Sequence, residues 1–425
     1  MPKRKNNRTG NQALVREINL SMIMRHLHHF APISRASLAE ITGLNKTTVS
    51  SLVQELIDYK FVRKIGRDSA GTGRPAILLE LNPAAGCIVS AEIGVDFISV
   101  FCTDFAIKII WSHQEHIQPD MGQKAIINRV LELLCQAEEA ANPRPLLGVA
   151  IGVPGLVRQQ DGTLLFAPNL GWRDIPVRDT FDQWFNIPIF VDNESNMAAL
   201  GEYYFGAARD YQDVLCVSIG AGLGGAVIRD GQLLSGVSGL AGEFGHMTME
   251  PEGQLCKCGN RGCWETLVST TALFNYIQQA INRQKQSSLL IALTQGNLDC
   301  LNVPLIVEAA QLNDTLAQNA LDKVGYYLGI GLASLVNALN PELVVIGGPL
   351  SIAGELLLPV VNAGLKKRAL RWHEEAAKVV IAKHTSNACV IGGVVTVYQS
   401  VLAQPNRVRR PATLPKRVKD YSTVS

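Results

Sequence analysis

The sequence of 425 residues lacks several features that would assign it to a class at once. It has no uninterrupted run of 18 apolar residues, which excludes a simple membrane-spanning helix. No apolar segment follows the basic start at residues 1–5, so the pattern of a signal peptide is missing. These absences predict a cytoplasmic protein without a membrane partner. Its length predicts two or three domains, and its 47% hydrophobic residues, 18% charged residues and 37 Gly predict a folded rather than a disordered chain.

The chain also has little net charge, +2, which by itself argues against a nucleic-acid partner. The distribution of charge changes this interpretation. Residues 1–75 hold 13 Lys and Arg against 5 Asp and Glu, and residues 407–425 hold 6 against 1, which leaves an acidic body between them. A basic N-terminal region is suited to contact phosphates. The basic tail at 407–425 has no predicted role beyond that of a solvated end.

Residues 34–56 have the pattern of two short helices around a tight turn. Ser34 and Asn45 are residue types that cap helices, and Gly43 supplies the turn between them. In the second helix the apolar residues recur at the spacing of a single helical stripe. The residues expected to face inward are Leu38, Ala39 and Ile41 in the first helix and Val49, Leu52, Val53 and Leu56 in the second.

A strand at 61–65, a Gly-rich loop at 66–73 and a returning strand at 74–81 follow these helices. The order predicts a winged helix-turn-helix domain at 1–82 that binds double-stranded operator DNA, with an ordinary helical hairpin as the alternative. Arg74, in a Gly-Arg-Pro triplet, can enter a minor groove or contact a phosphate. The predicted DNA-binding residues are Arg35, Asn45, Lys46, Thr47, Thr48, Ser51, Gln54 and Arg74.

From about residue 86 onward the sequence has an α/β pattern. Four apolar strands, expected at 87–94, 147–153, 214–219 and 343–346, each end in a Gly-containing turn. Such turns bring backbone N–H groups towards a ligand. Together they favour a site of the size of a nucleotide or a sugar.

One imidazole and three thiols lie close together in this body. His246, Cys256, Cys258 and Cys263 fall within 18 residues, and Gly259 and Gly262 allow tight turns between them. Four protein ligands complete the tetrahedral set of a structural zinc ion, one per chain, and leave no open position for catalysis. The alternative is three incidental cysteines in a loop.

Two motifs around this cluster are specific. Residues 241–246 read Ala-Gly-Glu-Phe-Gly-His, and residues 256–265 read Cys-Lys-Cys-Gly-Asn-Arg-Gly-Cys-Trp-Glu. With the segments 167–172 and 192–202, they resemble the ROK (repressor, ORF, kinase) family over about 83–400. The resemblance implies a two-lobed, actin-like body of the ribonuclease-H type that holds a sugar in its cleft. The expected parts are lobe 1 at 83–200, completed by 392–406, and lobe 2, with the zinc loop, at 201–391.

The resemblance also implies which residues face the sugar. They are Asn169, Asn193, Glu194, Glu243, His246 and Glu265. The chemistry fits, because carboxylates accept hydrogen bonds from vicinal hydroxyls and asparagine both donates and accepts. His246 would bind zinc through one ring nitrogen and offer the other to a hydroxyl. The alternative for Glu243 and Glu265 is ordinary solvation in a loop.

Departures from the pattern of the family's kinases argue against an enzyme. Val95 and Asp96 stand where the kinases have Gly-Thr in a phosphate loop, and Ala221 replaces a threonine in the second loop. The position of the kinases' catalytic aspartate is Glu194, whose longer side chain displaces the carboxylate. No catalytic residue is therefore predicted.

The resulting hypothesis is a sugar-responsive transcriptional regulator, a repressor of carbohydrate-utilisation genes, that acts as a homodimer or homotetramer. The main alternative is an active ROK sugar kinase with an appended DNA-binding domain. A third is a constitutive DNA-binding protein with an empty cleft.

Overall fold

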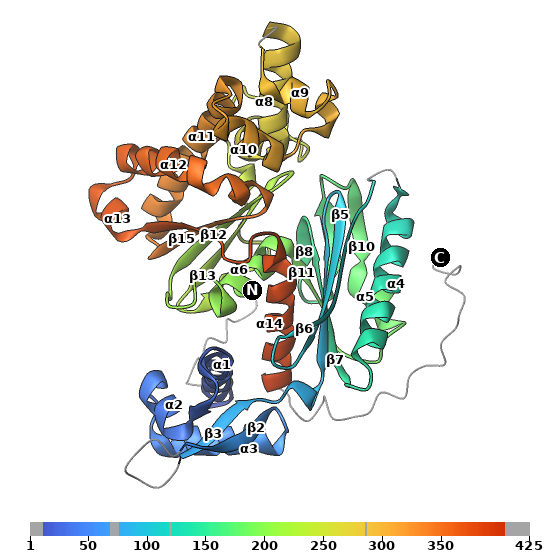
Figure 1. Cartoon of the computed structure of the whole chain (residues 1–425), viewed down its shortest axis with the longest axis vertical. Helices are drawn as coiled ribbons and strands as arrows, with labels where there is room; N and C mark the ends of the chain where they lie inside the picture. The colour runs from blue at the N-terminus through green and yellow to red at the C-terminus, as the bar shows by residue number, and fades with distance from the viewer. Residues whose placement is uncertain (1–11, 69–75, 119–120, 285–286, 404–425) are drawn as a thin grey trace, which may run out of the picture.

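The computed structural model of the chain describes residues 12–68, 76–118, 121–284 and 287–403. A small N-terminal head is followed by a body of two lobes, each with a five-stranded sheet (Figure 1).

The head combines three helices with a three-stranded sheet in the order β1-β3-β2. Ser34 and Asn45 accept hydrogen bonds from backbone N–H groups of the helices that they cap, and Gly43 ends α2 in the left-handed conformation, which confirms the predicted helix boundaries. The elements are α1 (Gln12–Phe30), β1 (Ile33–Ser34), α2 (Arg35–Thr42), α3 (Lys46–Asp58), β2 (Val62–Asp68) and β3 (Ala76–Leu81).

Three details of the head differ from the sequence prediction. The helix α1 was not predicted, because its apolar residues face both outward, as Ile18 does, and inward, as Ile23 does, so that no single stripe stands out. The strand β2 continues through Gly66 to Asp68, where a loop was expected. Ile41 is 43% exposed rather than inward-facing, because it lies in the last turn of α2 beside Gly43, where the chain turns away.

The two lobes have the same sheet topology. In each sheet the first three strands form an antiparallel meander. The fourth strand pairs in parallel with the first strand, and the fifth pairs in parallel with the fourth. The resulting orders are β6-β5-β4-β7-β11 and β14-β13-β12-β15-β16. This is the predicted ribonuclease-H-type arrangement, present twice. The strands of lobe 1 are β4 (Cys87–Ile93), β5 (Phe97–Asp104), β6 (Ile109–His116), β7 (Leu146–Val153) and β11 (Ile189–Asn193), and those of lobe 2 are β12 (Val214–Ile219), β13 (Leu223–Arg229), β14 (Gln232–Leu233), β15 (Leu343–Gly347) and β16 (Lys378–Ile381).

Helices cover both sheets. Lobe 1 also carries a small sheet of β8 (Leu156–Arg158), β9 (Thr163–Ala167) and β10 (Trp172–Pro176), with α4 (Gln123–Ala141), α5 (Val177–Asp182) and α6 (Glu194–Phe205). The helices of lobe 2 are α7 (Glu265–Val268), α8 (Thr270–Gln284), α9 (Leu289–Leu293), α10 (Val303–Gln311), α11 (Thr315–Leu339), α12 (Gly354–Arg368) and α13 (Arg371–Ala376).

The helix α14 (Ala388–Ala403) lies between the sheet of lobe 1 and α6. The segment 385–403 is long and apolar enough to cross a membrane by length and composition, yet 61% of it is buried inside the protein against α6, β4 and β7. We therefore interpret it as a core helix. The predicted lobe boundaries at 200 and 391 fall inside α6 and α14.

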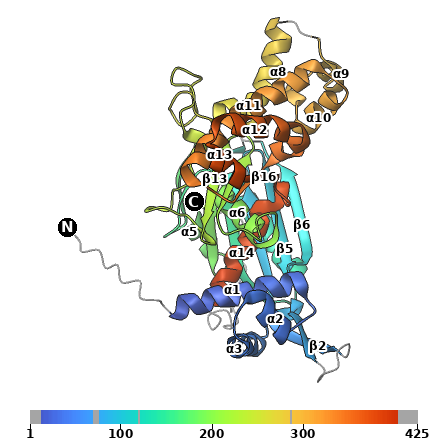
Figure 2. The ribbon, with the colours of Figure 1, turned by 90° about the vertical axis from the view of Figure 1, so that its left-hand side faces the viewer.

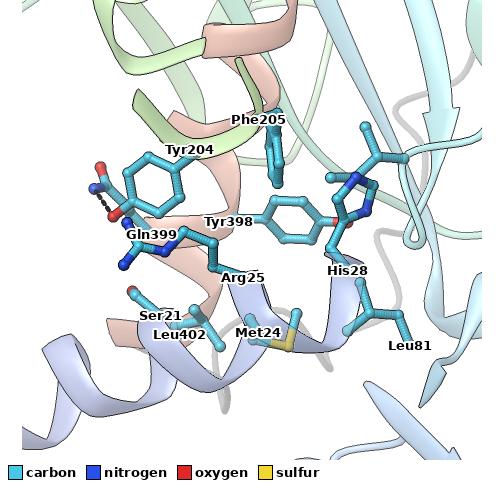
Figure 3. Close-up of a pocket in the computed structure, with 11 residues that line it drawn as sticks. Ser21, Met24, Arg25, His28, Leu81, Tyr204, Phe205, Tyr398, Gln399 and Leu402 are labelled. Atoms are coloured by element: carbon cyan, nitrogen blue, oxygen red, sulfur yellow. Dashed lines mark hydrogen bonds between the residues drawn. The ribbon is translucent and has the colours of Figure 1, made fainter. Parts of the chain in front are cut away.

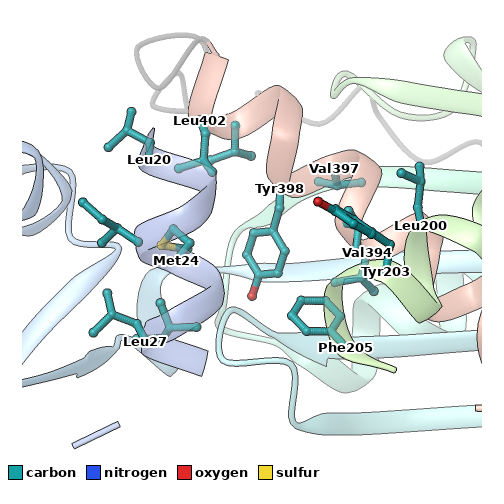
Figure 4. Packing of buried hydrophobic residues seen from close by; sticks show 14 of the residues in the cluster. Leu20, Met24, Leu27, Leu200, Tyr203, Phe205, Val394, Val397, Tyr398 and Leu402 are labelled. Carbon is teal, nitrogen blue, oxygen red and sulfur yellow. The ribbon is translucent and has the colours of Figure 1, made fainter. Parts of the chain in front are cut away.

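The head packs on the body through α1, which crosses the end of α14 (Figure 2). Figure 4 shows Met24 of α1 and Leu402 of α14 among the buried side chains at this contact, with Tyr398 beside them. The same cluster of buried apolar residues runs from α1 to α6 and α14, so head and body share one hydrophobic core.

Candidate DNA-binding face, metal cluster and ligand cleft

The polar face of α3 lies opposite its buried stripe. Lys46, Thr47, Ser51 and Gln54 are exposed on α3, as is the capping Asn45, and Thr48 is half-buried. Arg35 of α2 donates a hydrogen bond of 3.0 Å to Oε1 of Gln54, whose Nε2 donates one of 2.9 Å to Asp58. The amide of Gln54 is thus held in one orientation. The predicted Arg74 lies outside the described residues.

A cavity of about 530 Å³ opens between the two lobes. All four Gly-containing turns reach it, through Gly94, Gly155, Gly220 and Gly348. The cavity also brings together all six residues that the resemblance places at the sugar, which come from distant parts of the chain. They are Asn169, Asn193, Glu194, Glu243, His246 and Glu265.

The side chains of Asn193 and Glu194 are fixed at the start of α6. Asn193 caps this helix by accepting hydrogen bonds from two backbone N–H groups, and its amide nitrogen donates to Oε2 of Glu194 over 2.7 Å and to the carbonyl of Gly155 over 3.0 Å. The neighbouring loop passes close by, because a Cβ atom on Gly222 would stand 2.7 Å from Oε2 of Glu265 and 3.0 Å from Nδ2 of Asn169. A larger residue here would push the ends of these two side chains aside.

Burial in the cleft raises the pKa of three carboxyl groups. Burial, with a smaller contribution from the charges of Glu92 and Glu243, raises the pKa of Glu194 to about 8. Burial also raises the pKa of Glu92 to about 8, and that of Glu243 above its usual value. A carboxyl group that holds its proton at neutral pH can donate a hydrogen bond as well as accept one.

Two residues of the cleft were missed as site residues by the sequence reasoning. Glu92 is the last but one residue of strand β4, Cys389 is the second residue of α14, and both line the cavity. The position of Glu92 at the carboxyl end of a central strand was a usable signal, because ligands of open α/β sheets bind there. Cys389 carried no such signal in a long apolar segment.

The four predicted metal ligands lie together. One ligand atom from each of His246, Cys256, Cys258 and Cys263 lies within 4.8 Å of the others. The sulfurs of Cys258 and Cys263 are 3.7 Å apart, and Nδ1 of His246 is 3.8 Å from the sulfur of Cys256. A tetrahedral ion with bonds of about 2.0–2.3 Å requires edges of about 3.5–3.8 Å. The donor set therefore fits such an ion.

The cluster is joined to the cleft through its own residues. With Nδ1 of His246 facing Cys256, its Nε2 lies 3.9 Å from Oε2 of Glu243. Oε1 of Glu265 lies 2.8 Å from the sulfur of Cys256. Between Cys263 and Glu265, the indole of Trp264 is fully buried against α11 and donates a hydrogen bond of 3.0 Å to the carbonyl of Tyr327.

A second, small pocket lies where the head meets the body (Figure 3). Arg25 and His28 of α1 line it opposite Tyr204 and Tyr398, and Gln399 donates a hydrogen bond of 3.0 Å to the hydroxyl of Tyr204. Phe61 of the head stacks at 4.7 Å on Phe105 of lobe 1, which in turn meets the ring of Tyr398 at 4.8 Å.

With this geometry described, the comparisons with known proteins assign the family. The model of the ROK family matches residues 88–400. The chain belongs to the ROK family. This membership confirms the predicted family, and the structures matched below confirm the fold class.

Three ROK relatives illustrate the similarity. A putative xylose repressor of Caldicellulosiruptor sp. (strain Rt8B.4) is 36% identical over 401 residues, which cover 94% of this chain and 100% of the relative. The crystal structure of a ROK family transcriptional regulator, a homolog of the E. coli MLC protein, matches 92% of this chain and 97% of that chain with a TM-score of 0.74 and 26% identity. The crystal structure of a ROK family glucokinase from Streptomyces griseus, in complex with glucose and AMPPNP, matches 74% of this chain and 100% of that chain with a TM-score of 0.67 and 32% identity.

Three residues that the sequence analysis compared with the family's kinases lie in one region. Val95, Asp96 and Ala221 line the same cavity as Glu194, on the turns after β4 and β12.

Proposed function

We propose that this protein is a sugar-responsive transcriptional repressor. The observation that supports it most directly is that one chain carries a helix with an exposed polar face, α3, and a cavity of sugar size, linked through α1 and α14. The N-terminal end of α14 lines the cleft at Cys389, and its C-terminal end packs on α1 through Leu402. Relatives named as repressors match almost the whole chain, head included.

The head is proposed to bind operator DNA with α3 in the major groove. Lys46 and Arg35 supply charge to the phosphates, and Thr47, Thr48, Ser51 and Gln54 present short polar groups to base edges. Two heads are needed to read a bipartite operator, so we propose a homodimer or a homotetramer. This function places the protein in the cytoplasm.

The cleft is proposed to bind the sugar effector through hydroxyl groups. Asn193 and Glu194 lie on one side of the cavity, and Glu243, His246 and Glu265 on the other, so a ring held between them bridges both lobes. Because the bound sugar contacts both lobes, it stabilises one relative position of the lobes over others. The helix α14 then carries this difference to α1 and the head.

We propose that the His246 and Cys cluster holds one structural zinc ion. The ion would be held by His246, Cys256, Cys258 and Cys263 and would supply only rigidity. Its effect on sugar binding is indirect, because the chain between Cys256 and Glu265, and the ring of His246, are fixed relative to Glu243.

We infer that phosphoryl transfer is not the activity. Asp96 adds a negative charge beside the expected phosphate path, and Val95 adds bulk there. Residues that have lost this chemistry still accept and donate hydrogen bonds to a sugar.

A single panel of sugars tests the function. Purified protein bound to labelled operator DNA is exposed to pentoses, hexoses and amino sugars, and each is scored for thermal stabilisation and for release of DNA. One sugar is expected to do both. Sugar-dependent formation of ADP from ATP and Mg²⁺ would instead favour the kinase, and absence of any thermal shift would favour a constitutive DNA-binding protein.

A further inference from the structure

The charge of the cleft carries information about the effector. Among the described residues that line the cavity, there are five carboxyl side chains and two histidines, but neither lysine nor arginine. The carboxyl groups are those of Glu92, Asp96, Glu194, Glu243 and Glu265. Sites for phosphate esters present cations or free backbone N–H groups instead.

Three backbone N–H groups in two of the Gly-containing turns already face an acceptor within the protein. The N–H of Gly94 donates to the carbonyl of Phe97 over 2.8 Å, and that of Gly220 donates to the carbonyl of Gly222 over 3.0 Å. The N–H of Leu223 faces Oε2 of Glu265 at 3.4 Å. Turns of this kind hold phosphate only when their N–H groups point at it without a competing acceptor.

One carboxyl oxygen of Glu92 lacks a hydrogen-bond partner among the described residues. The residue is 9% exposed, and although its carboxyl group interacts with the thiol of Cys389, its Oε2 has no hydrogen-bond partner in the part of the chain that the structure describes. A buried carboxyl oxygen without a partner is costly, and a hydroxyl group in the cavity relieves that cost by donating to it or accepting from it. A phosphate oxygen can only accept, so it can pair with this carboxyl group only in its protonated form, whereas a hydroxyl group can pair with either form.

We propose that the cleft selects an uncharged, unphosphorylated sugar, that Glu92 is an additional residue that binds a sugar hydroxyl, and that Asp96 rejects a phosphate ester. This inference rests on the proposed function, because it names the chemical class of the effector in the same cleft. A phosphate monoester brings nearly two negative charges to a cavity whose described lining residues include neither lysine nor arginine and where Asp96 is exposed.

The test compares D-xylose, D-glucose and N-acetyl-D-glucosamine with their phosphate monoesters by titration calorimetry and by release of operator DNA. For the sugar that binds, its phosphate ester is expected to bind at least about 100-fold more weakly. Asp96→Asn is expected to reduce this difference in affinity by about fivefold, because the phosphate ester then binds more tightly. The control Asp322→Asn makes the same change of charge on an exposed part of α11 and should leave this difference unchanged.

Glu92 is tested with two variants. Glu92→Gln keeps a donor and an acceptor and should change the affinity for the neutral sugar by no more than about threefold, whereas Glu92→Leu should weaken it by about tenfold. Equal or tighter binding of a phosphate ester, or equal effects of Asp96→Asn and Asp322→Asn, would overturn the inference. If an ester alone releases DNA, the proposed function stands and this inference fails. If no sugar of either kind binds, both fail.

Discussion

The two proposed binding regions are built differently. On α3 and its cap, the side chains proposed to contact DNA lie within residues 45–54, and most of them are exposed. The carboxyl groups of the cleft come from positions as far apart in the sequence as Glu92 and Glu265, and they lie between two lobes. The first surface depends on a local fold of about 20 residues. The second depends on two sheets, a metal cluster and α14. A substitution at many different places in the body should therefore weaken sugar binding. A substitution on the exposed face of α3 should weaken DNA binding alone.

The strongest way to separate the two regions is to remove the metal cluster. We expect Cys258→Ser, or treatment with a chelator, to lower the melting temperature by about 10 °C or more and to abolish the thermal shift caused by sugar, because the loop carrying Glu243 and Glu265 loses its anchor. Metal analysis should find one zinc per wild-type chain. The control Cys300→Ser changes an exposed thiol outside the cluster. Wild-type stability of Cys258→Ser would contradict the zinc assignment.

A substitution on α3 should have the opposite selectivity, because it should weaken DNA binding and leave sugar binding unchanged. Gln54→Ala removes the amide held by Arg35 and Asp58, and we expect operator affinity to fall by about 10- to 100-fold in a gel-shift titration. The thermal shift caused by sugar should not change. The control is Gln311→Ala, at an exposed position of α10 in lobe 2. A variant that keeps operator affinity would show that α3 is not oriented as proposed.

Weakening the contact between α1 and α14 should uncouple sugar binding in the cleft from DNA binding by the head. Leu402→Ala, which truncates a side chain packed near Met24, should leave sugar and DNA binding measurable but reduce the effect of sugar on DNA affinity by about fivefold. The control Leu365→Ala truncates a similarly buried leucine in lobe 2 and should lose stability but not coupling. Equal loss of coupling in both variants would mean that global destabilisation, not this contact, is responsible.

The smallest expected effect is a dependence of stability on pH that belongs to the cleft. Burial raises the pKa of Glu92 and Glu194 from 4.5 to about 8, so the folded state holds protons that the unfolded state releases. This contribution is complete below pH 4.5 and is lost as the pH rises through 8. Melting temperatures between pH 6 and 9 should fall less steeply for Glu92→Gln than for the wild type. Glu308→Gln, on the exposed face of α10, should follow the wild type.

The same contrast explains how far the sequence could predict the structure. The caps Ser34 and Asn45 and the stripe from Val49 to Leu56 act between near neighbours, so the two helices of the head could be derived directly. The Gly-containing turns indicated a ligand site, but its sugar-facing residues could be placed only through the family motifs, because nothing local brings Asn169 beside Gly222. Glu92 was overlooked since its burial and its unpartnered oxygen are produced by the packing of α14, which no local pattern encodes.

The position of Trp264 has a practical consequence. Its indole is fully buried, donates its single hydrogen bond to Tyr327, and stands between a thiol of the metal cluster and a carboxyl group of the cleft. Trp372, at 76% exposure, lies on the surface of α13. The chain thus carries an internal fluorophore beside the proposed effector site, and a change in its emission can follow occupation of the cleft in real time without any label.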